Sequence, residues 1–423
     1  MIRTLYSWAL WLAQPLLRRK LRRRAVAEPG YGEAIEQRFG DYADLPATGG
    51  GYVWVHAVSL GETRAAAALI AQLRQALPGM CLLLTHGTAT GREQGRALLQ
   101  EGDVQVWQPW DTPGAVRRFL TRFQPRVGLL METEVWPNLV AGCATLRVPL
   151  CLVNARLSDK SLRQALRVSW LARPAYSGLR AVWAQTPDDA TRLRQLGAPV
   201  QGVMGNFKFD VLPDVAQLAL GRQWRMAHGK PVLMFASSRE GEEDLWLEAL
   251  QGLSADARQA LASVQWLVVP RHPQRFDEVA QALQGAGFAV SRRSQWQGTP
   301  PPAHVWLGDS LGEMAMYFGL ADAALLGGSF APLGGQNLIE AAACGCPVIM
   351  GPHTFNFADA ARTAAQEGAA FEVPDMPAAL VLAGELLASD AQHLKARNAA
   401  HAWSQSHRGA AARTVAAIVE QVL

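Results

Sequence analysis

The sequence predicts an α/β protein of two domains, each built on a parallel sheet with crossover helices. Its 423 residues exceed the roughly 250 to 300 at which a single hydrophobic core stops growing. From residue 51 onward, short apolar runs alternate with segments of helical period, as in parallel strands joined by helices. Hydrophobic residues make up 49% and charged residues 18%, which argues against long disordered segments.

Two series of apolar runs give the expected strands. The first half contains Tyr52–Ala57, Cys81–Thr85, Val104–Trp107, Val127–Met131, Pro149–Val153 and Ala181–Ala184. The second half contains Pro231–Ala236, Trp266–Pro270, Phe288–Val290, Val305–Leu307, Ala323–Leu326 and Val348–Met350. Weak periodicity between Gly205 and Pro213 marks the boundary. We therefore expect domains at residues 25–207 and 208–395, followed by an Ala-rich helix at 396–423 that could fold back across the cleft.

The first 24 residues have a composition of their own. Ile2 to Leu17 is apolar and contains Trp8 and Trp11, and Arg18–Arg24 then places six positive charges in seven residues. The apolar part is short of the about 20 residues that span a bilayer. A cleaved signal peptide carries its charge mainly before the apolar part, and core helices rarely end in six cations. Rather than a signal peptide or a core helix, we expect residues 1–24 to be an anchor on an anionic, cytoplasmic membrane surface.

The cysteines and the remaining charge indicate neither a metal nor a nucleic-acid partner. The five cysteines form no C-x-x-C pair, and Cys344 and Cys346 have no second ligand pair at zinc spacing. We expect reduced cysteines in a cytosolic setting and no metal or other cofactor. The net charge of +4 is modest and is concentrated in the N-terminal run.

The loop after the first expected strand carries a candidate catalytic base. Ligands of open parallel sheets gather at the carboxyl ends of the strands, where this chain reads Val58-Ser59-Leu60-Gly61-Glu62-Thr63. It lacks the G-x-G-x-x-G fingerprint of nicotinamide enzymes. Glu62, at the start of a helix, could accept a proton from an attacking sugar hydroxyl. The alternative is an acid favoured there by the helix dipole, and a useful base needs partial desolvation to offset that dipole.

Two further loops of the first half are polar. After Val127–Met131 the chain reads E-T-E-V-W-P-N, and an E-x-E metal pair is conceivable there, although no other carboxylate cluster completes a site. We favour one of Glu132 and Glu134 in the cleft and the other in a structural ion pair. The turn Thr85–Gly91 suits phosphate or sugar hydroxyls, with Thr85 and Thr88 as candidate contacts, but such turns are also common helix caps.

In the second half, an arginine and a glycine-rich turn point to a phosphate. Arg271 ends a strand and could grip a phosphate in bidentate fashion, although a lone arginine there is more often a surface ion pair. Between residues 327 and 351, Gly334 and Gly335 allow backbone N–H groups to approach a phosphate at a helix start. Glu340 lies one turn further, where it could bind ribose hydroxyls. A leaving phosphate would then be stabilised by helix N-termini and cations such as Arg271.

At these motifs the chain resembles the 3-deoxy-D-manno-octulosonic acid (Kdo) transferases of lipopolysaccharide synthesis over nearly its whole length. The matching motifs are V-S-L-G-E at Val58–Glu62, E-T-E-V-W-P-N at Glu132–Asn138, G-N-F-K-F-D at Gly205–Asp210, E-G-E-E at Glu240–Glu243, R-H-P at Arg271–Pro273, G-G-Q-N-L-I-E at Gly334–Glu340 and G-P-H-T-F-N-F at Gly351–Phe357. The chain departs from the family at Ser238-Arg239, where a Thr-His pair is expected, so the resemblance assigns no phosphate contact to that loop.

The resemblance implies a GT-B glycosyltransferase fold, in which two Rossmann-like domains face a central cleft. It implies transfer of Kdo from CMP-Kdo to the lipid A precursor lipid IVA, with inversion and without a metal, at the cytoplasmic face of the inner membrane. It assigns the general base to Glu62 and a second essential acid to Glu132. The other contacts that we expect are those of the donor, at Arg271, Pro273, Gly328, Gly334, Gly335, Gln336, Asn337 and Glu340, and those of acceptor or phosphate groups, at Ser59, Gly61, Thr85, Thr88 and Lys208.

Two other functions stay open at this point. A nucleotide-sugar epimerase or another GT-B transferase would share the glycine-rich loop but should lack the anchor and the motif around Lys208. A membrane-surface binding protein with a vestigial cleft would use only the basic run, and it should be indifferent to Glu62→Gln.

Overall fold

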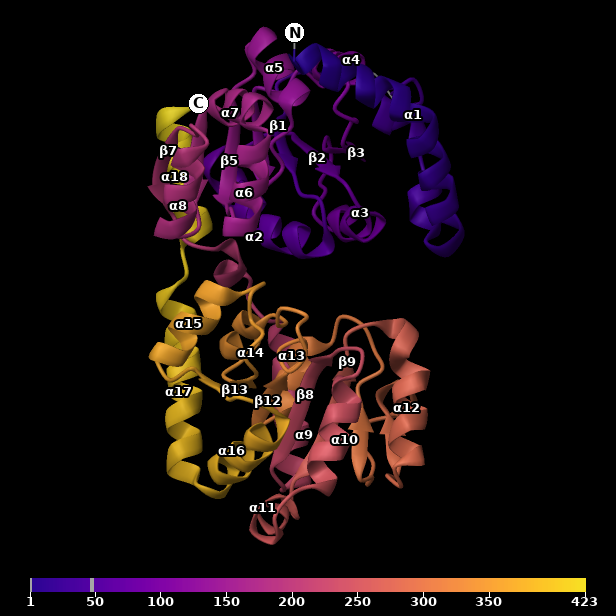
Figure 1. Ribbon diagram of the computed structural model, residues 1–423, viewed down its shortest axis with the longest axis vertical. Helices are drawn as coiled ribbons and strands as arrows, with labels where there is room; N and C mark the ends of the chain where they lie inside the picture. Colours follow the sequence, from indigo (N-terminus) through magenta and orange to yellow (C-terminus); the bar gives the residue numbers. More distant parts are fainter. Residues whose placement is uncertain (1, 46–48) are drawn as a thin grey trace. The chain divides into compact units, whose positions relative to one another are not determined.

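The computed structural model describes residues 2–45 and 49–423, which form two compact units. The first unit consists of Met1–Val211 and Arg408–Leu423, and the second of Leu212–His407 (Figure 1). Each unit contains one seven-stranded sheet in which all pairings are parallel. The expected α/β class with two Rossmann-like domains is therefore confirmed.

The sheet of the first unit has the strand order β3-β2-β1-β4-β5-β6-β7. Its strands are β1 (Val53–His56), β2 (Leu82–His86), β3 (Val104–Trp107), β4 (Val127–Met131), β5 (Leu150–Ala155), β6 (Ala181–Ala184) and β7 (Val200–Val203). The central strands are buried along their whole length because helices cover both faces of a parallel sheet. Trp54 packs on one face against Phe119, whereas its neighbours Val53 and Val55 belong to the core on the other face.

Most helices of the first unit connect these strands, while α1 (Ile2–Ala27) precedes them and α18 (Ala410–Gln421) returns from the end of the chain. The others are α2 (Leu60–Ala76), α3 (Ala89–Arg96), α4 (Pro113–Phe123), α5 (Pro137–Thr145), α6 (Asp159–Arg167), α7 (Ser169–Ser177) and α8 (Pro187–Gln195), with 3-10 turns η1 (Pro29–Gly32), η2 (Ile35–Phe39) and η3 (Phe207–Asp210). The C-terminal helix α18 packs against α2. Its start is held by Asp210, whose carboxylate accepts the backbone N–H groups of Gly409 and Ala411.

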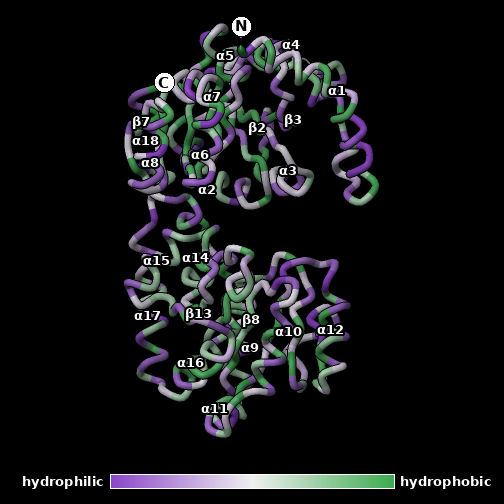
Figure 2. The backbone as a smooth tube through the Cα atoms, in the orientation of Figure 1, coloured by the Kyte–Doolittle hydropathy of each residue, from purple (hydrophilic) through white to green (hydrophobic). Residues whose placement is uncertain are grey.

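Helix α1 is attached to the first unit along both halves, since the hydroxyls of Tyr6 and Ser7 donate to Asp111 and Asn138 and the second half packs on an apolar cluster. Leu21 is buried with Tyr31 and Phe39, and the Arg18 guanidinium lies over the Phe39 ring. The first half exposes large apolar side chains, with Trp8 60% exposed, and hydrophilic residues gather further along the helix (Figure 2). In the ranges described, none of the helices has both the length and the apolar character needed to cross a bilayer.

The sheet of the second unit has the order β10-β11-β9-β8-β12-β13-β14. Its strands are β8 (Val232–Ser238), β9 (Gln265–Pro270), β10 (Val290–Arg292), β11 (Val305–Leu307), β12 (Ala323–Leu326), β13 (Val348–Met350) and β14 (Ala370–Glu372). One core contains Phe235 of β8 and a tryptophan pair, Trp246 and Trp266, whose ring centroids are 5.1 Å apart.

The second unit has nine helices among the residues described. They are α9 (Val215–His228), α10 (Glu242–Gln251), α11 (Ala255–Leu261), α12 (Phe276–Gly285), α13 (Met314–Leu320), α14 (Leu338–Ala343), α15 (Ala358–Gln366), α16 (Met376–Ala388) and α17 (Asp390–Ser406), with 3-10 turns η4 (Pro273–Arg275) and η5 (Arg293–Gln295). Helices α9 and α13 pack closely together, and α13 also contacts β8.

Two strands were missed by the sequence analysis. Both β7 and β14 are terminal strands of their sheets and have exposed positions. The segment V-Q-G-V of β7 and the three-residue β14 therefore lack the continuous apolar run that identified the buried strands.

Candidate active site

The order of the strands places one candidate site on each unit. In each sheet the chain adds strands first on one side of the initial strand and then on the other. The strand order therefore reverses between β1 and β4 in the first sheet and between β8 and β12 in the second. Loops at the carboxyl ends of such a strand pair form the usual ligand site of open α/β sheets. The loop that contains Glu62 follows β1, and the loop that contains Glu132 follows β4. The glycine-rich segment that begins at Gly327 follows β12.

Glu62 lies in the first turn of α2, where Ser59 is the N-cap. Its carboxylate accepts the Val58 N–H at 2.9 Å and the Ser59 hydroxyl at 3.0 Å. Capping of this kind normally lowers the pKa of a glutamate. Here burial, followed by the nearby charge of Glu132, outweighs those hydrogen bonds and raises the pKa of Glu62 to about 7. The carboxylate therefore has the partial desolvation and the proton affinity that suit a general base.

Glu132 lies between two cations. Its carboxylate is 3.9 Å from the Lys208 ammonium and 3.8 Å from the Arg156 guanidinium. Glu134 accepts the indole N–H of Trp136 at 2.9 Å, and burial raises its pKa. Of the two glutamates, Glu132 makes the ion pairs, and it is also the larger electrostatic influence on Glu62.

Three strained backbone positions adjoin these sites. Glu132, Asn154 and Ser237 have φ values of 57°, 50° and 58° and lie at the ends of β4, β5 and β8. Side chains other than glycine rarely adopt this conformation, and such strain concentrates at functional sites. Asn154 also accepts the Phe207 N–H at 3.1 Å, which fixes the turn that carries Lys208.

The turn after β2 supports the loop that carries Glu62. His86 is fully buried, and its Nδ1 donates to the Ala57 carbonyl, while its Nε2 accepts from Gln105. Burial lowers the pKa of His86 to about 4, so the ring is neutral at pH 7. Thr85 is also fully buried, and its hydroxyl accepts the Trp54 indole N–H at 2.8 Å. Thr85 thus lies in the core beneath the loops.

The other predicted contacts of the first unit lie around the same loop. Thr88 donates its hydroxyl hydrogen to the Val58 carbonyl and caps α3 by accepting the Gly91 N–H. Gly61 is exposed in the first turn of α2. The Thr88 hydroxyl therefore fixes the loop that precedes Glu62, through its hydrogen bond to Val58.

On the second unit, two predicted donor contacts meet. The Arg271 guanidinium donates to the Gln336 side-chain oxygen at 3.2 Å. The Gly335 N–H donates to the Gly328 carbonyl at 2.7 Å, and the Gln336 N–H donates to the Gly327 carbonyl at 3.0 Å. The two ends of the glycine-rich segment are therefore joined beside Arg271.

The remaining donor candidates surround that junction. Gly334 has a φ of 93°, which other residues rarely adopt, and a Cβ there would lie 2.4 Å from the Asn356 amide nitrogen, so the Asn356 side chain would have to move. Asn337 caps α14 by accepting a backbone N–H, and Glu340 follows in the first turn of that helix. Pro273 is exposed at the start of η4, two residues after Arg271.

Two residues of these loops carry roles that the sequence analysis did not assign. Arg156 was not singled out, because it approaches Glu132 only through the pairing of β4 with β5. Glu242 belongs to the noted motif E-G-E-E, yet it binds backbone groups of the segment after β12, which no local pattern reveals. At the unusual Ser238-Arg239 pair, Ser238 donates to Glu243, and Arg239 pairs with Glu240.

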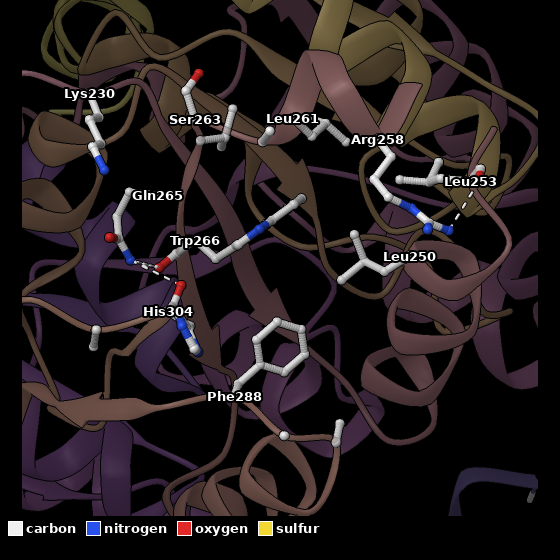
Figure 3. Close-up of a pocket in the computed structure, with 15 residues that line it drawn as sticks. Lys230, Leu250, Leu253, Arg258, Leu261, Ser263, Gln265, Trp266, Phe288 and His304 are labelled. Carbon is white, nitrogen blue, oxygen red and sulfur yellow. Dashed lines mark hydrogen bonds between the residues drawn. The ribbon is translucent and has the colours of Figure 1, made fainter. Parts of the chain in front are cut away.

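A separate cavity of about 560 Å³ lies at the opposite end of the second sheet, where β9 begins (Figure 3). Trp266 and Phe288 lie at its centre, and Lys230, Arg258 and His304 contribute its polar side chains. None of the predicted donor contacts lines it. Within residues 2–45 and 49–423, no group of three His, Cys, Asp or Glu side chains is arranged to hold a metal ion.

Comparison with known proteins connects this geometry to one family. Residues 33–211 match the family model for 3-deoxy-D-manno-octulosonic-acid transferase (kdotransferase). The chain is 50% identical to the 3-deoxy-D-manno-octulosonic acid transferase of Bordetella pertussis, over 98% of both chains. It is 32% identical to the Haemophilus influenzae transferase of the same name, over 98% of this chain and 97% of the relative.

Solved structures support the same fold at lower identity. The UDP-GlcNAc 2-epimerase of Neisseria meningitidis, bound to UDP-GlcNAc, aligns with a TM-score of 0.60 at 15% identity, over 87% of this chain and all of that one. Anabaena HepE, in complex with UDP, aligns with a TM-score of 0.58 at 14% identity, over 88% of this chain and all of that one. At these identities the likeness concerns the fold alone.

Proposed function

The chain belongs to the 3-deoxy-D-manno-octulosonic acid (Kdo) transferase family and is a glycosyltransferase, and we propose that it transfers Kdo from CMP-Kdo to the lipid A precursor, lipid IVA, in lipopolysaccharide biosynthesis. The transfer inverts the configuration at the anomeric carbon and needs no metal. The observation that supports this chemistry best is the raised pKa, about 7, of Glu62 in the first turn of α2.

In the proposed reaction Glu62 is the general base. An acceptor hydroxyl attacks the anomeric carbon of Kdo, and its proton passes to the Glu62 carboxylate as the new C–O bond forms. The bond from the anomeric carbon to the CMP phosphate breaks, and CMP leaves with the electron pair. Glu132 assists by disfavouring the ionised form of Glu62, which strengthens its affinity for the proton.

The donor binds at the glycine-rich segment of the second unit. The Arg271 guanidinium is charged and exposed beside Gln336, which allows it to meet the phosphate of CMP. The N–H groups of Gly328 and Gly335 are taken by Glu242 and by the Gly328 carbonyl, so these glycines and Gly334 serve the phosphate by letting the backbone lie close to it without side chains in the way. Asn337 and Glu340 then bind the nucleoside.

Positive charge on the first unit binds the acceptor. Lys208 and Arg156 both lie within 4 Å of Glu132, which places two cations in this group of side chains, where they can meet an anionic substrate group. Exposed Trp8 and Trp11 and the basic run of α1 hold the enzyme on the cytoplasmic face of the inner membrane, where a lipid acceptor lies.

Transfer is tested with the full-length protein, CMP-Kdo generated in situ and lipid IVA. The expected product is the acceptor with its mass increased by one or more Kdo units. CMP release without a gain in acceptor mass would indicate donor hydrolysis, and a product derived from the donor alone would favour an epimerase. Either result would overturn the proposed transfer.

A further inference from the structure

We propose that Glu242 is a positioning residue for the donor-binding loop. Its carboxylate binds backbone N–H groups and so orders the loop that lies beside the nucleotide. The inference rests on the proposed function, because it takes the second unit as the site of CMP. Glu242 begins α10 and is fully buried. Burying a carboxylate destabilises the folded state unless hydrogen-bond donors surround it. The donors around Glu242 therefore indicate the role of this buried side chain.

Four backbone N–H groups converge on this one carboxylate. Oε2 accepts from Gly328 at 2.6 Å and from Arg239 at 2.9 Å. Oε1 accepts from Phe330 at 3.0 Å and from Ala331 at 3.3 Å. Donors from two loops, one after β8 and one after β12, thus meet at Glu242. These two strands are neighbours at the point where the sheet order reverses, which is the ligand-binding position of this fold.

The contacts of Glu242 continue directly to the predicted donor residues. Gly328, whose N–H donates to Glu242, also accepts the Gly335 N–H through its carbonyl oxygen. The carbonyl oxygen of the adjacent Gly327 accepts the Gln336 N–H. The Gln336 side chain in turn accepts from Arg271. Displacing the carboxylate therefore releases the segment that carries these donor contacts.

The two loops leave little room for an alternative arrangement. A Cβ on Gly327 would lie 2.1 Å from the Ser237 carbonyl oxygen, and Ser237 itself has a φ of 58°. Burial raises the pKa of Glu242, but the four donors favour the ionised carboxylate, because a carboxyl hydrogen would find no acceptor among them. An amide in its place offers one acceptor oxygen and turns an N–H group toward these donors.

Glu243 is the matched control, since it is adjacent, equally buried and on the same helix. Its carboxylate accepts from Ser238 at 2.6 Å and pairs with Arg275 at 2.8 Å. The hydrogen bonds of Glu243 in the described structure do not involve the segment after β12. Glu242→Gln and Glu243→Gln therefore both remove a buried charge, but only the first releases the donor loop.

The test is CMP binding by the full-length protein, measured by calorimetry, with the KM for the donor and the KM for the acceptor determined in parallel. We expect Glu242→Gln to weaken CMP binding and raise the donor KM by about tenfold or more, while the acceptor KM changes less than about twofold. Glu243→Gln should keep its CMP affinity within about threefold of the wild type, even with a similar fall in melting temperature.

Four results would contradict the positioning role of Glu242 or the donor site. A folded Glu242→Gln variant with wild-type CMP affinity, or an equal loss of affinity in Glu243→Gln, would overturn the positioning role. If Glu242→Gln does not fold, Glu242→Asp replaces it, because the charge remains but lies one methylene short of the loop, and unchanged CMP affinity there would also overturn the role. Absence of CMP binding by the wild type would overturn the proposed donor site itself.

Discussion

Glu62→Gln is expected to lower kcat about 1,000-fold, within the usual 100- to 10,000-fold range for a general base, while the donor KM stays near its wild-type value. The amide keeps an oxygen that can accept the Val58 N–H, but it cannot take up the acceptor's proton. The measurement is the single-turnover rate with saturating CMP-Kdo and lipid IVA.

The loss should not reflect unfolding. The pKa of Glu62 is raised to about 7, so its contribution to stability is full below the unfolded value and is lost as pH rises through about 7. At pH 8 the glutamine variant should therefore melt no lower than the wild type. Asp188→Asn is the control, because Asp188 is an exposed acid in the first turn of α8, and its loss should leave the rate unchanged. A Glu62→Gln variant with more than a tenth of the wild-type rate would exclude Glu62 as the base.

Gly221→Ala is expected to destabilise the second unit by about 3 kcal/mol or more. Gly221 lies inside α9, and a Cβ there would meet the Met316 carbonyl oxygen of α13 at 2.0 Å and the Leu320 nitrogen at 2.9 Å. Backbone atoms cannot move aside as the end of a flexible side chain does, so the two helices must separate. Melting temperature measures the effect, which should be a fall of roughly 6 to 12 °C.

The control for that substitution is Gly285→Ala at the end of α12. Here a Cβ would have no atom within 4 Å, so the change should be neutral or stabilising by up to about 1 kcal/mol. Equal melting temperatures for the two alanine variants would contradict the close packing of α9 on α13.

Features that depend on local sequence were predictable. The buried strands were recognised because helices on both sides of a parallel sheet require continuous apolar runs. The position of Glu62 followed from the rule that places ligands at the ends of such strands. The raised pKa of Glu62 could not be predicted, because it depends first on burial by the folded chain and then on the charge of Glu132, about 70 residues along the chain after β4.

Features that depend on distant segments were not predictable. Glu242 binds Gly328, which lies 86 residues further along, and nothing near Glu242 indicates that contact. Arg156 acquires its neighbour through strand pairing, and the strained conformation of Asn154 has no sequence signature. The resemblance to a family supplied the motif around Glu242 but not the physical reason for it.

The dependence of the single-turnover rate on pH tests the role of Glu62 most directly. The rate should rise with pH and level off, with a midpoint near 7, because only the ionised carboxylate accepts a proton. In Glu132→Gln the midpoint should move to lower pH, since the neighbouring negative charge that raises the pKa of Glu62 is gone. A rate that is flat between about pH 5.5 and 8.5, or a midpoint near 7 that persists in Glu62→Gln, would contradict Glu62 as the general base.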